Sequence, residues 1–153
     1  YIKNELKKNF KNNYGKIYEA YDQLHYTING VKLTFFEYNY NINHRRKYKD
    51  YITMPSLLDL AAMKASAFGG PGKWKDYVDM YFILKNKYDI TQIIARAEKL
   101  FSNEFNGKLF IQQLGYFDDI SYEEVVEYLI EAPKTEQIKE YLLQKSLEFK
   151  FDG

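Results

Sequence analysis

The chain lacks several features that would assign it to a class of protein at once. It contains no cysteine, which excludes disulfide bonds and thiolate metal sites within it. It has no run of about 18 apolar residues, so we expect no membrane-spanning segment and no membrane partner. Its formal net charge is only +1, which gives no global electrostatic case for binding nucleic acid. The absence of cysteine fits a reducing compartment, and we expect a cytoplasmic location.

Aromatic residues are abundant instead. The 153 residues include 16 tyrosines and 11 phenylalanines, and 46% of the chain is hydrophobic, as in an ordinary globular domain. Tyrosine requires a hydrogen-bond partner for its hydroxyl, so it suits a cleft as well as a core. The chain begins at Tyr1 inside a helix-like pattern, and we therefore expect it to be a piece of a longer protein.

The first forty residues predict a helix followed by an antiparallel meander. Apolar residues four apart predict the helix, and alternating apolar and polar residues predict three strands. These elements are expected over residues 1–13, 16–21, 23–28 and 31–38. Asn29-Gly30 is typical of a two-residue type I′ hairpin turn. In the third strand, we expect one face to carry Val31, Leu33 and Phe35 and the other face to carry Lys32, Thr34 and Phe36.

A polar connection over residues 39–53 is expected next. It contains a basic cluster of His44, Arg45, Arg46 and Lys47 among tyrosines. Two interpretations stay open here, a solvated loop and a surface that contacts phosphates.

The segment 54–84 predicts two amphipathic helices separated by Gly69-Gly70-Pro71-Gly72, which cannot continue a helix. Ser56 is a suitable N-cap, with Asp59 three residues later as in a capping box. The second helix is expected to start near Lys73. Lys64 lies on or beside the apolar stripe of the first helix.

The charged residues of these two helices allow two interpretations. Asp76 and Asp79 are three residues apart and share one side of the second helix, where they could form a polar site with Lys64. Alternatively, Lys64 buries only its aliphatic stem. In that interpretation Lys75 and Asp79 form only a surface ion pair, which contributes about 0.3–0.5 kcal/mol.

The rest of the chain is expected to be helical over residues 92–101, 109–114, 121–130 and 135–149. Asp89 or Thr91 is expected to cap the first of these helices, and Ser121 with Glu124 to open the third. Asp118-Asp119 could be a carboxylate pair for acid–base work or a turn that caps the next segment. No set of metal-ligating residues is predicted.

Three motifs taken together resemble a known family. LAAMK (residues 60–64), KDYVD (residues 75–79) and YFDD (residues 116–119) occur here in the order typical of the AbiEii-like, or abortive-infection, nucleotidyltransferase toxins. The resemblance covers nearly the whole chain. It implies an α+β fold, with a small antiparallel meander and an N-terminal helix in a partial nucleotidyltransferase core (1–53). A mostly helical part (54–153) would be packed on it, as one compact unit.

The resemblance also implies an enzyme that uses a nucleoside triphosphate and Mg²⁺ to transfer a nucleotide to an acceptor such as tRNA. The nucleotide-binding lysines would be Lys64 and Lys75. The catalytic aspartates would be Asp79, as the first choice, and Asp76. An antitoxin protein is the expected neutralising partner.

The chain departs from the family pattern in one respect that matters for catalysis. The family's Gly-Ser or Gly-Gly motif and its Asp-x-Asp metal pair should precede Tyr1 and are not in this sequence. We therefore expect the chain alone to be inactive. Two other function classes stay open, a non-catalytic module that binds an antitoxin or another protein, and an RNA-binding domain that uses Arg45, Arg46 and Lys47.

Overall fold

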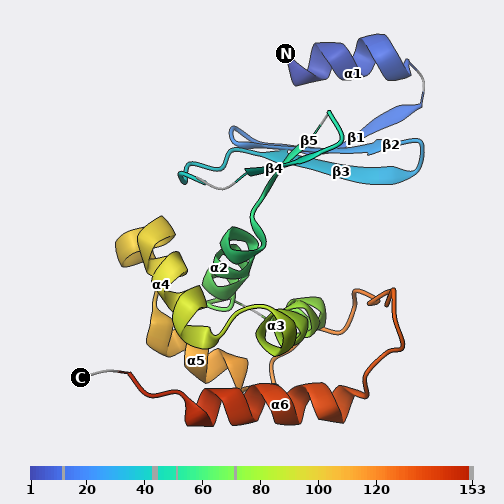
Figure 1. The fold of residues 1–153 in the computed structure, drawn as a ribbon. Coiled ribbons are helices and arrows are strands. Elements are labelled where there is room, and N and C mark those ends of the chain that lie inside the picture. Colours follow the sequence, from blue (N-terminus) through green and yellow to red (C-terminus); the bar gives the residue numbers. More distant parts are fainter. Residues whose placement is uncertain (12, 43–44, 51, 71, 152–153) are drawn as a thin grey trace. The chain divides into compact units, whose positions relative to one another are not determined.

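A computed structural model describes residues 1–11, 13–42, 45–50, 52–70 and 72–151, without the side chain of Arg45. His44 and Pro71 lie outside the described residues. The chain divides into two compact units, Tyr1–Asn39 and Tyr40–Gly153. Both helices and strands are present, which confirms the α+β fold (Figure 1).

The first unit is a helix and a three-stranded antiparallel sheet in the order β1-β2-β3. Its elements are α1 (Ile2–Phe10), β1 (Tyr14–Glu19), β2 (Gln23–Ile28) and β3 (Val31–Phe36). Asn29 and Gly30 form the turn between β2 and β3, with φ values of 50° and 80°. Positive φ at both positions is what a type I′ turn requires, and Ile28 pairs with Val31 to close it.

One face of this sheet carries the core of the first unit. Leu6 of α1 and Tyr26 and Ile28 of β2 are buried together, and Phe35 of β3 packs against them. Thr34, the neighbour of Phe35, is exposed on the other face, where it pairs with His25. The expected alternation of β3 is therefore confirmed.

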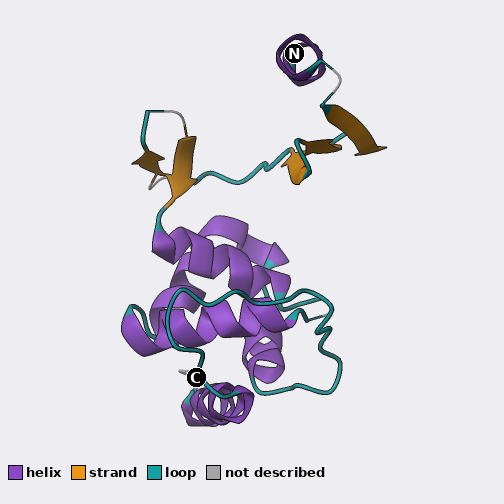
Figure 2. Ribbon diagram, turned by 90° about the vertical axis from the view of Figure 1, so that its right-hand side faces the viewer, coloured by secondary structure: helices purple, strands orange, loops and turns teal. Residues whose placement is uncertain are grey.

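The second unit consists of a two-stranded ribbon and a group of helices that share one core (Figure 2). Its elements are β4 (Arg45–Tyr48), β5 (Ile52–Pro55), α2 (Leu57–Ala67), α3 (Trp74–Asn86), α4 (Ile90–Phe101), η1 (Ser102–Glu104), α5 (Gly107–Leu114) and α6 (Thr135–Glu148). Helix α2 packs against α3 and α4, and α6 packs against α3 and α5. None of the described helices combines the length and apolar content needed to cross a membrane.

The boundary between the units differs from the one expected after residue 53. It lies between Asn39 and Tyr40, because Tyr40 packs edge-on against Phe101 and donates a hydrogen bond to Glu104. The expected polar connection also contains a regular ribbon, in which Arg46 pairs with Met54 and Tyr48 with Ile52. Cations in β4 hide the apolar alternation by which a strand is usually recognised.

The helix expected over residues 121–130 is not formed, and this prediction was wrong. The backbone of Ser121 instead forms hydrogen bonds with the residues on either side of Lys73. Ser121 N donates to Gly72 O and Trp74 N donates to Ser121 O, each at 2.9 Å. Glu124, expected in a capping box, binds two lysines instead. Tertiary contacts have therefore overridden a local helix signal.

Candidate functional site

Helix α2 places Lys64 at the edge of the helical core. The Ser56 hydroxyl accepts a hydrogen bond from Asp59 N at 3.1 Å, which confirms Ser56 as the N-cap of α2. Ala61 and Ala65 are fully buried and allow the neighbouring helices to approach α2 closely. Lys64 lies beside this small-residue stripe, and only 19% of its side chain is exposed.

Helix α3 presents both aspartates to Lys64. It starts at Trp74 with Lys73 as its N-cap residue, as expected. The buried Tyr77 fixes the orientation of the helix, because its hydroxyl donates to the carbonyls of Gln113 and Tyr116 at 3.0 and 3.1 Å. Burial raises the pKa of the Tyr77 hydroxyl, which keeps it a donor.

Three charged groups meet between these helices. The Lys64 ammonium lies 2.8 Å from Asp76 Oδ1 and 2.7 Å from Asp79 Oδ2. Burial lowers the pKa of Lys64, but the hydrogen bonds to Asp76 and Asp79 outweigh it, and the net effect is a raised pKa. Lys64 is therefore held as a cation. The structure brings it together with both aspartates, as one of the two interpretations of the sequence required.

This ion pair opens onto a cavity of about 320 Å³. Most of the cavity wall is apolar, whereas Lys64 and Asp79 supply opposite charges. The lining residues are Leu57, Leu60, Lys64, Asp79, Phe82, Ile83, Asn86 and Lys87. Asp76 is 23% exposed and Asp79 is 52% exposed, so Asp79 is the more accessible of the two carboxylates. An apolar pocket with a few convergent charges is the usual form of a ligand site.

Lys75 is not part of this group. It binds Glu124, which also accepts a bond from Lys73 at 2.6 Å. The two lysines lower the pKa of Glu124 to about 2. The predicted nucleotide-binding role of Lys75 stays a prediction, since the geometry joins it to a different acid from those that bind Lys64.

Asp118 and Asp119 are exposed in a turn. The segment that follows them contains no helix, so there is none for them to cap.

Two charged contacts were not found from the sequence. Asp59 is completely buried on α2 and accepts a hydrogen bond from Arg96 of α4. The signal available was Arg96 itself, which interrupts an otherwise apolar stripe of α4. Lys139 of α6 lies over the rings of Trp74, Phe117 and Tyr122, with its ammonium 5.6–6.0 Å from each centroid. Trp74, Phe117 and Tyr122 are far from Lys139 in sequence, so no sequence pattern predicts this contact.

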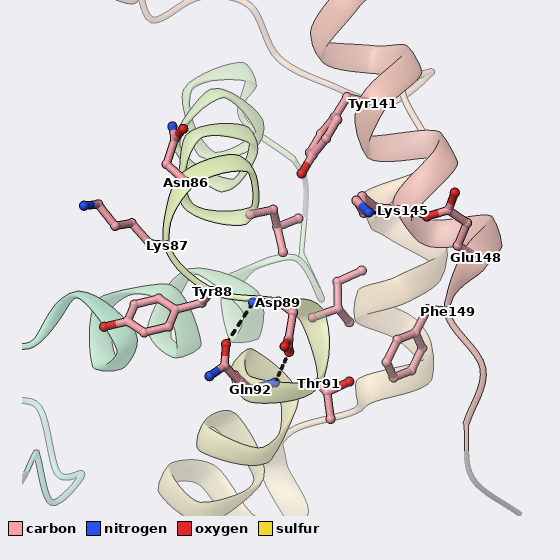
Figure 3. A pocket seen from close by; sticks show the side chains of 12 residues that line it. Asn86, Lys87, Tyr88, Asp89, Thr91, Gln92, Tyr141, Lys145, Glu148 and Phe149 are labelled. Atoms are coloured by element: carbon pink, nitrogen blue, oxygen red, sulfur yellow. Dashed lines mark hydrogen bonds and ion pairs between the residues drawn. The ribbon is translucent and has the colours of Figure 1, made fainter.

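A larger cavity, of about 510 Å³, lies where the α3–α4 junction faces α6 (Figure 3). Several of its polar side chains have partners within the protein. Asp89 and Gln92 form the capping box that starts α4, which decides the predicted cap in favour of Asp89. Lys145 pairs with Glu148 at 3.3 Å. The cavity at Lys64 is taken as the candidate site because it is lined by Lys64 and Asp79, two of the residues predicted from the sequence.

Comparison with known proteins gives one relative and no family. The chain is 30% identical over 136 residues to an uncharacterized protein of Aquifex aeolicus (strain VF5). The aligned region covers 87% of this chain and 64% of the relative, so the chain spans less than two thirds of that protein. No family model and no solved structure matches the chain.

Proposed function

We propose that this chain is part of a nucleotidyltransferase of the AbiEii-like type, in which Lys64 binds the phosphates of a nucleoside triphosphate. The observation that carries the proposal is the ion pair of Lys64 with both Asp76 and Asp79 at the wall of a cavity. A tRNA acceptor and an antitoxin partner belong to the same proposal and come from the resemblance alone. A cytoplasmic location is also part of the proposal and is supported by the absence of cysteine.

The two aspartates have different roles in this proposal. Asp76, the less exposed, holds the Lys64 ammonium in place from the first turn of α3. Asp79, the more exposed, gives up its place on Lys64 to a phosphate oxygen. Positioning and charge stabilisation supply most of the catalysis in phosphoryl transfer. An ammonium already oriented by a carboxylate suits that task.

The transfer step follows from these roles. The acceptor hydroxyl oxygen forms a bond to the α-phosphorus while the bond from that phosphorus to the β-phosphate oxygen breaks. Pyrophosphate leaves with the bonding electron pair, and Lys64 stabilises the charge that develops on its oxygens. The hydroxyl proton passes to the Asp79 carboxylate, acting as a general base.

The described residues do not fit the Mg²⁺ site that the resemblance implies. None of them forms a group of three or more histidine, aspartate or glutamate side chains that could hold a metal ion. Asp76 and Asp79 are both bound to Lys64. We therefore assign no step to a metal, and propose that the 153-residue chain alone binds triphosphate without transferring a nucleotide.

Triphosphate binding by the chain tests the role of Lys64. Lys64→Ala should weaken binding of a fluorescent nucleoside triphosphate by about 10- to 100-fold, since a hydrogen bond from a charged group contributes about 1.5–3 kcal/mol. Lys108→Ala removes an exposed lysine of α5 and should leave binding unchanged. If folded Lys64→Ala binds as well as the unmodified chain, Lys64 serves only to join α2 and α3.

The role of Asp79 is tested in the full-length gene product with a labelled nucleotide. Asp79→Asn should abolish transfer, because the amide cannot accept the proton of the acceptor hydroxyl. Triphosphate binding should be kept, because the substitution removes a negative charge that repels phosphate. Transfer at the unmodified rate would exclude Asp79 as the base.

A further inference from the structure

The near-neutral net charge conceals a separation of charge along the chain. Residues 1–53 contain ten Lys and Arg against five Asp and Glu, a formal charge of +5. Residues 54–153 contain 12 against 16, a formal charge of −4. The basic part includes strand β4 and the turn after it, where residues 45–49 hold four cations. A local surface can therefore attract a polyanion although the whole chain does not.

Three cations of this ribbon have no carboxylate partner among the residues that the structure describes. Arg46, Lys47 and Lys49 are exposed. No ion pair of the described residues includes any of them, whereas Lys3, Lys16, Lys64, Lys73 and Lys75 all bind a carboxylate. Three unpaired cations within four residues repel one another, and a bound polyanion would remove that repulsion.

The register places an aromatic ring among these cations. Side chains alternate between the two faces along a strand, so Arg46 and Tyr48 of β4 lie on one face and Lys47 on the other. Tyr48 is 54% exposed, and the Lys49 ammonium lies 5.9 Å from the centroid of its ring. An exposed ring beside cations offers a base a surface for stacking and offers the adjacent phosphates their counter-charge.

We propose that the ribbon β4–β5 binds a single-stranded polynucleotide, with Arg46, Lys47 and Lys49 on the phosphates and Tyr48 stacked on a base. A lipid surface fits less well, because Lys49 and Asp50 place charges in the turn, where a membrane-inserting hairpin would be apolar. The proposal does not depend on nucleotide transfer or on Lys64.

Fluorescence anisotropy of a short labelled single-stranded RNA with the 153-residue chain tests the proposal. The variant Arg46→Gln/Lys47→Gln/Lys49→Gln should weaken binding by at least about tenfold. It should also reduce the slope of log K against log salt by about 2, since each neutralised phosphate of a single strand contributes about 0.7. Lys99→Gln/Lys108→Gln/Lys150→Gln removes the same charge from exposed positions of the acidic part and should change neither quantity.

The ring is tested separately from the charge. Tyr48→Ala should weaken binding by about tenfold, whereas Tyr48→Phe keeps a stacking surface and should bind nearly as well as the unmodified chain. Lys64→Ala should bind RNA normally, so a failure of the transfer proposal leaves this one standing. Single-stranded DNA of the same sequence shows whether the sugar matters.

Four results would overturn the proposal. The first is equal loss of affinity in the ribbon and control triple variants. The second is loss of affinity only when Lys7, Lys8 and Lys11 of the N-terminal basic segment are changed to Gln. The third is competition by polyglutamate as effective, charge for charge, as that by RNA. The fourth is binding to phosphatidylserine vesicles with none to RNA.

Discussion

Two clusters of lysine and acid on helix α3 use the same chemistry in opposite proportions. In the first, one ammonium, Lys64, binds two carboxylates at 2.8 and 2.7 Å. In the second, one carboxylate, Glu124, binds two ammonium groups, Lys73 and Lys75. The first cluster joins two core helices and lines a cavity, whereas the second joins the start of α3 to an irregular segment.

The difference between the clusters is mainly one of solvent access. The Lys64 side chain is 19% exposed, while the side chains of Lys73 and Glu124 are 52% and 46% exposed. Water and salt screen an exposed pair, so it contributes little to stability. A partly buried cation interacts more strongly with its partners and with any bound anion. Residue type and spacing therefore indicate a site less well than whether the residues lie on a buried or an exposed face of the helix.

The largest effect is expected from a change that moves the start of α3, which both clusters share. In Gly72→Ala the new Cβ would lie 3.0 Å from Tyr77 Cε2 and 3.1 Å from its hydroxyl oxygen. Tyr77 is buried and anchors α3, so it has little room to move. The free energy of unfolding should fall by about 1–3 kcal/mol in urea denaturation.

The matched control is Gly70→Ala, whose Cβ would meet only the Ala67 carbonyl at 3.8 Å. Both substitutions reduce the entropy of the unfolded chain, by amounts that differ because Gly70 precedes Pro71, and only Gly72→Ala adds the close contact with Tyr77. Equal stability of the two variants would show that the anchoring of α3 by Tyr77 is unimportant.

A smaller effect should separate the two clusters directly. Lys64→Met keeps the aliphatic stem but leaves Asp76 and Asp79 facing each other without a cation. We expect a loss of about 1–2 kcal/mol, less than for a fully buried pair because Asp79 is half exposed. Lys75→Met should cost less than about 0.5 kcal/mol, because Glu124 keeps Lys73. Equal losses of stability for the two variants in urea denaturation would show that the burial of Lys64 does not make its cluster the more stabilising one.

The sequence predicted most of the fold because most local signals agree with the tertiary structure. Asn29-Gly30, Ser56 and Asp89 act through their own backbone neighbours. The first two were placed correctly, and Asp89 was one of the two caps expected for its helix. The helix predicted after Ser121 was wrong because there the local signal disagrees with the tertiary structure. Backbone hydrogen bonds to residues 72–74 and the ion pairs of Glu124 with two lysines compete with the helix.

The candidate site was predictable in part. A lysine beside an apolar stripe and two aspartates on one helix side led to Lys64, Asp76 and Asp79. Lys75 was grouped with Lys64 through the resemblance, and spacing suggested a pair with Asp79. Neither could show its contact with Glu124, which depends on the path of the chain after Ser121. Arg96 and Asp59 lie 37 residues apart, and only the packing of α2 on α4 brings them together.

The smallest effect should come from titrating the exposed cluster. Lys73 and Lys75 lower the pKa of Glu124 from 4.5 to about 2 in the folded chain. A lowered folded-state pKa stabilises the protein above the unfolded-state pKa, and this stability is lost as the pH falls from about 4.5 towards 2. Glu124→Gln lacks this contribution at every pH.

The unmodified chain should therefore be slightly more stable than Glu124→Gln at pH 6, and the two should converge near pH 2 in urea denaturation. Asp118→Asn, a control for general acid effects, removes an exposed carboxylate of the neighbouring turn for which no ion pair is seen among the described residues. Its stability should run parallel to that of the unmodified chain over the same range. A difference for Glu124→Gln that stays constant with pH would show that the two lysines do not hold Glu124 in solution.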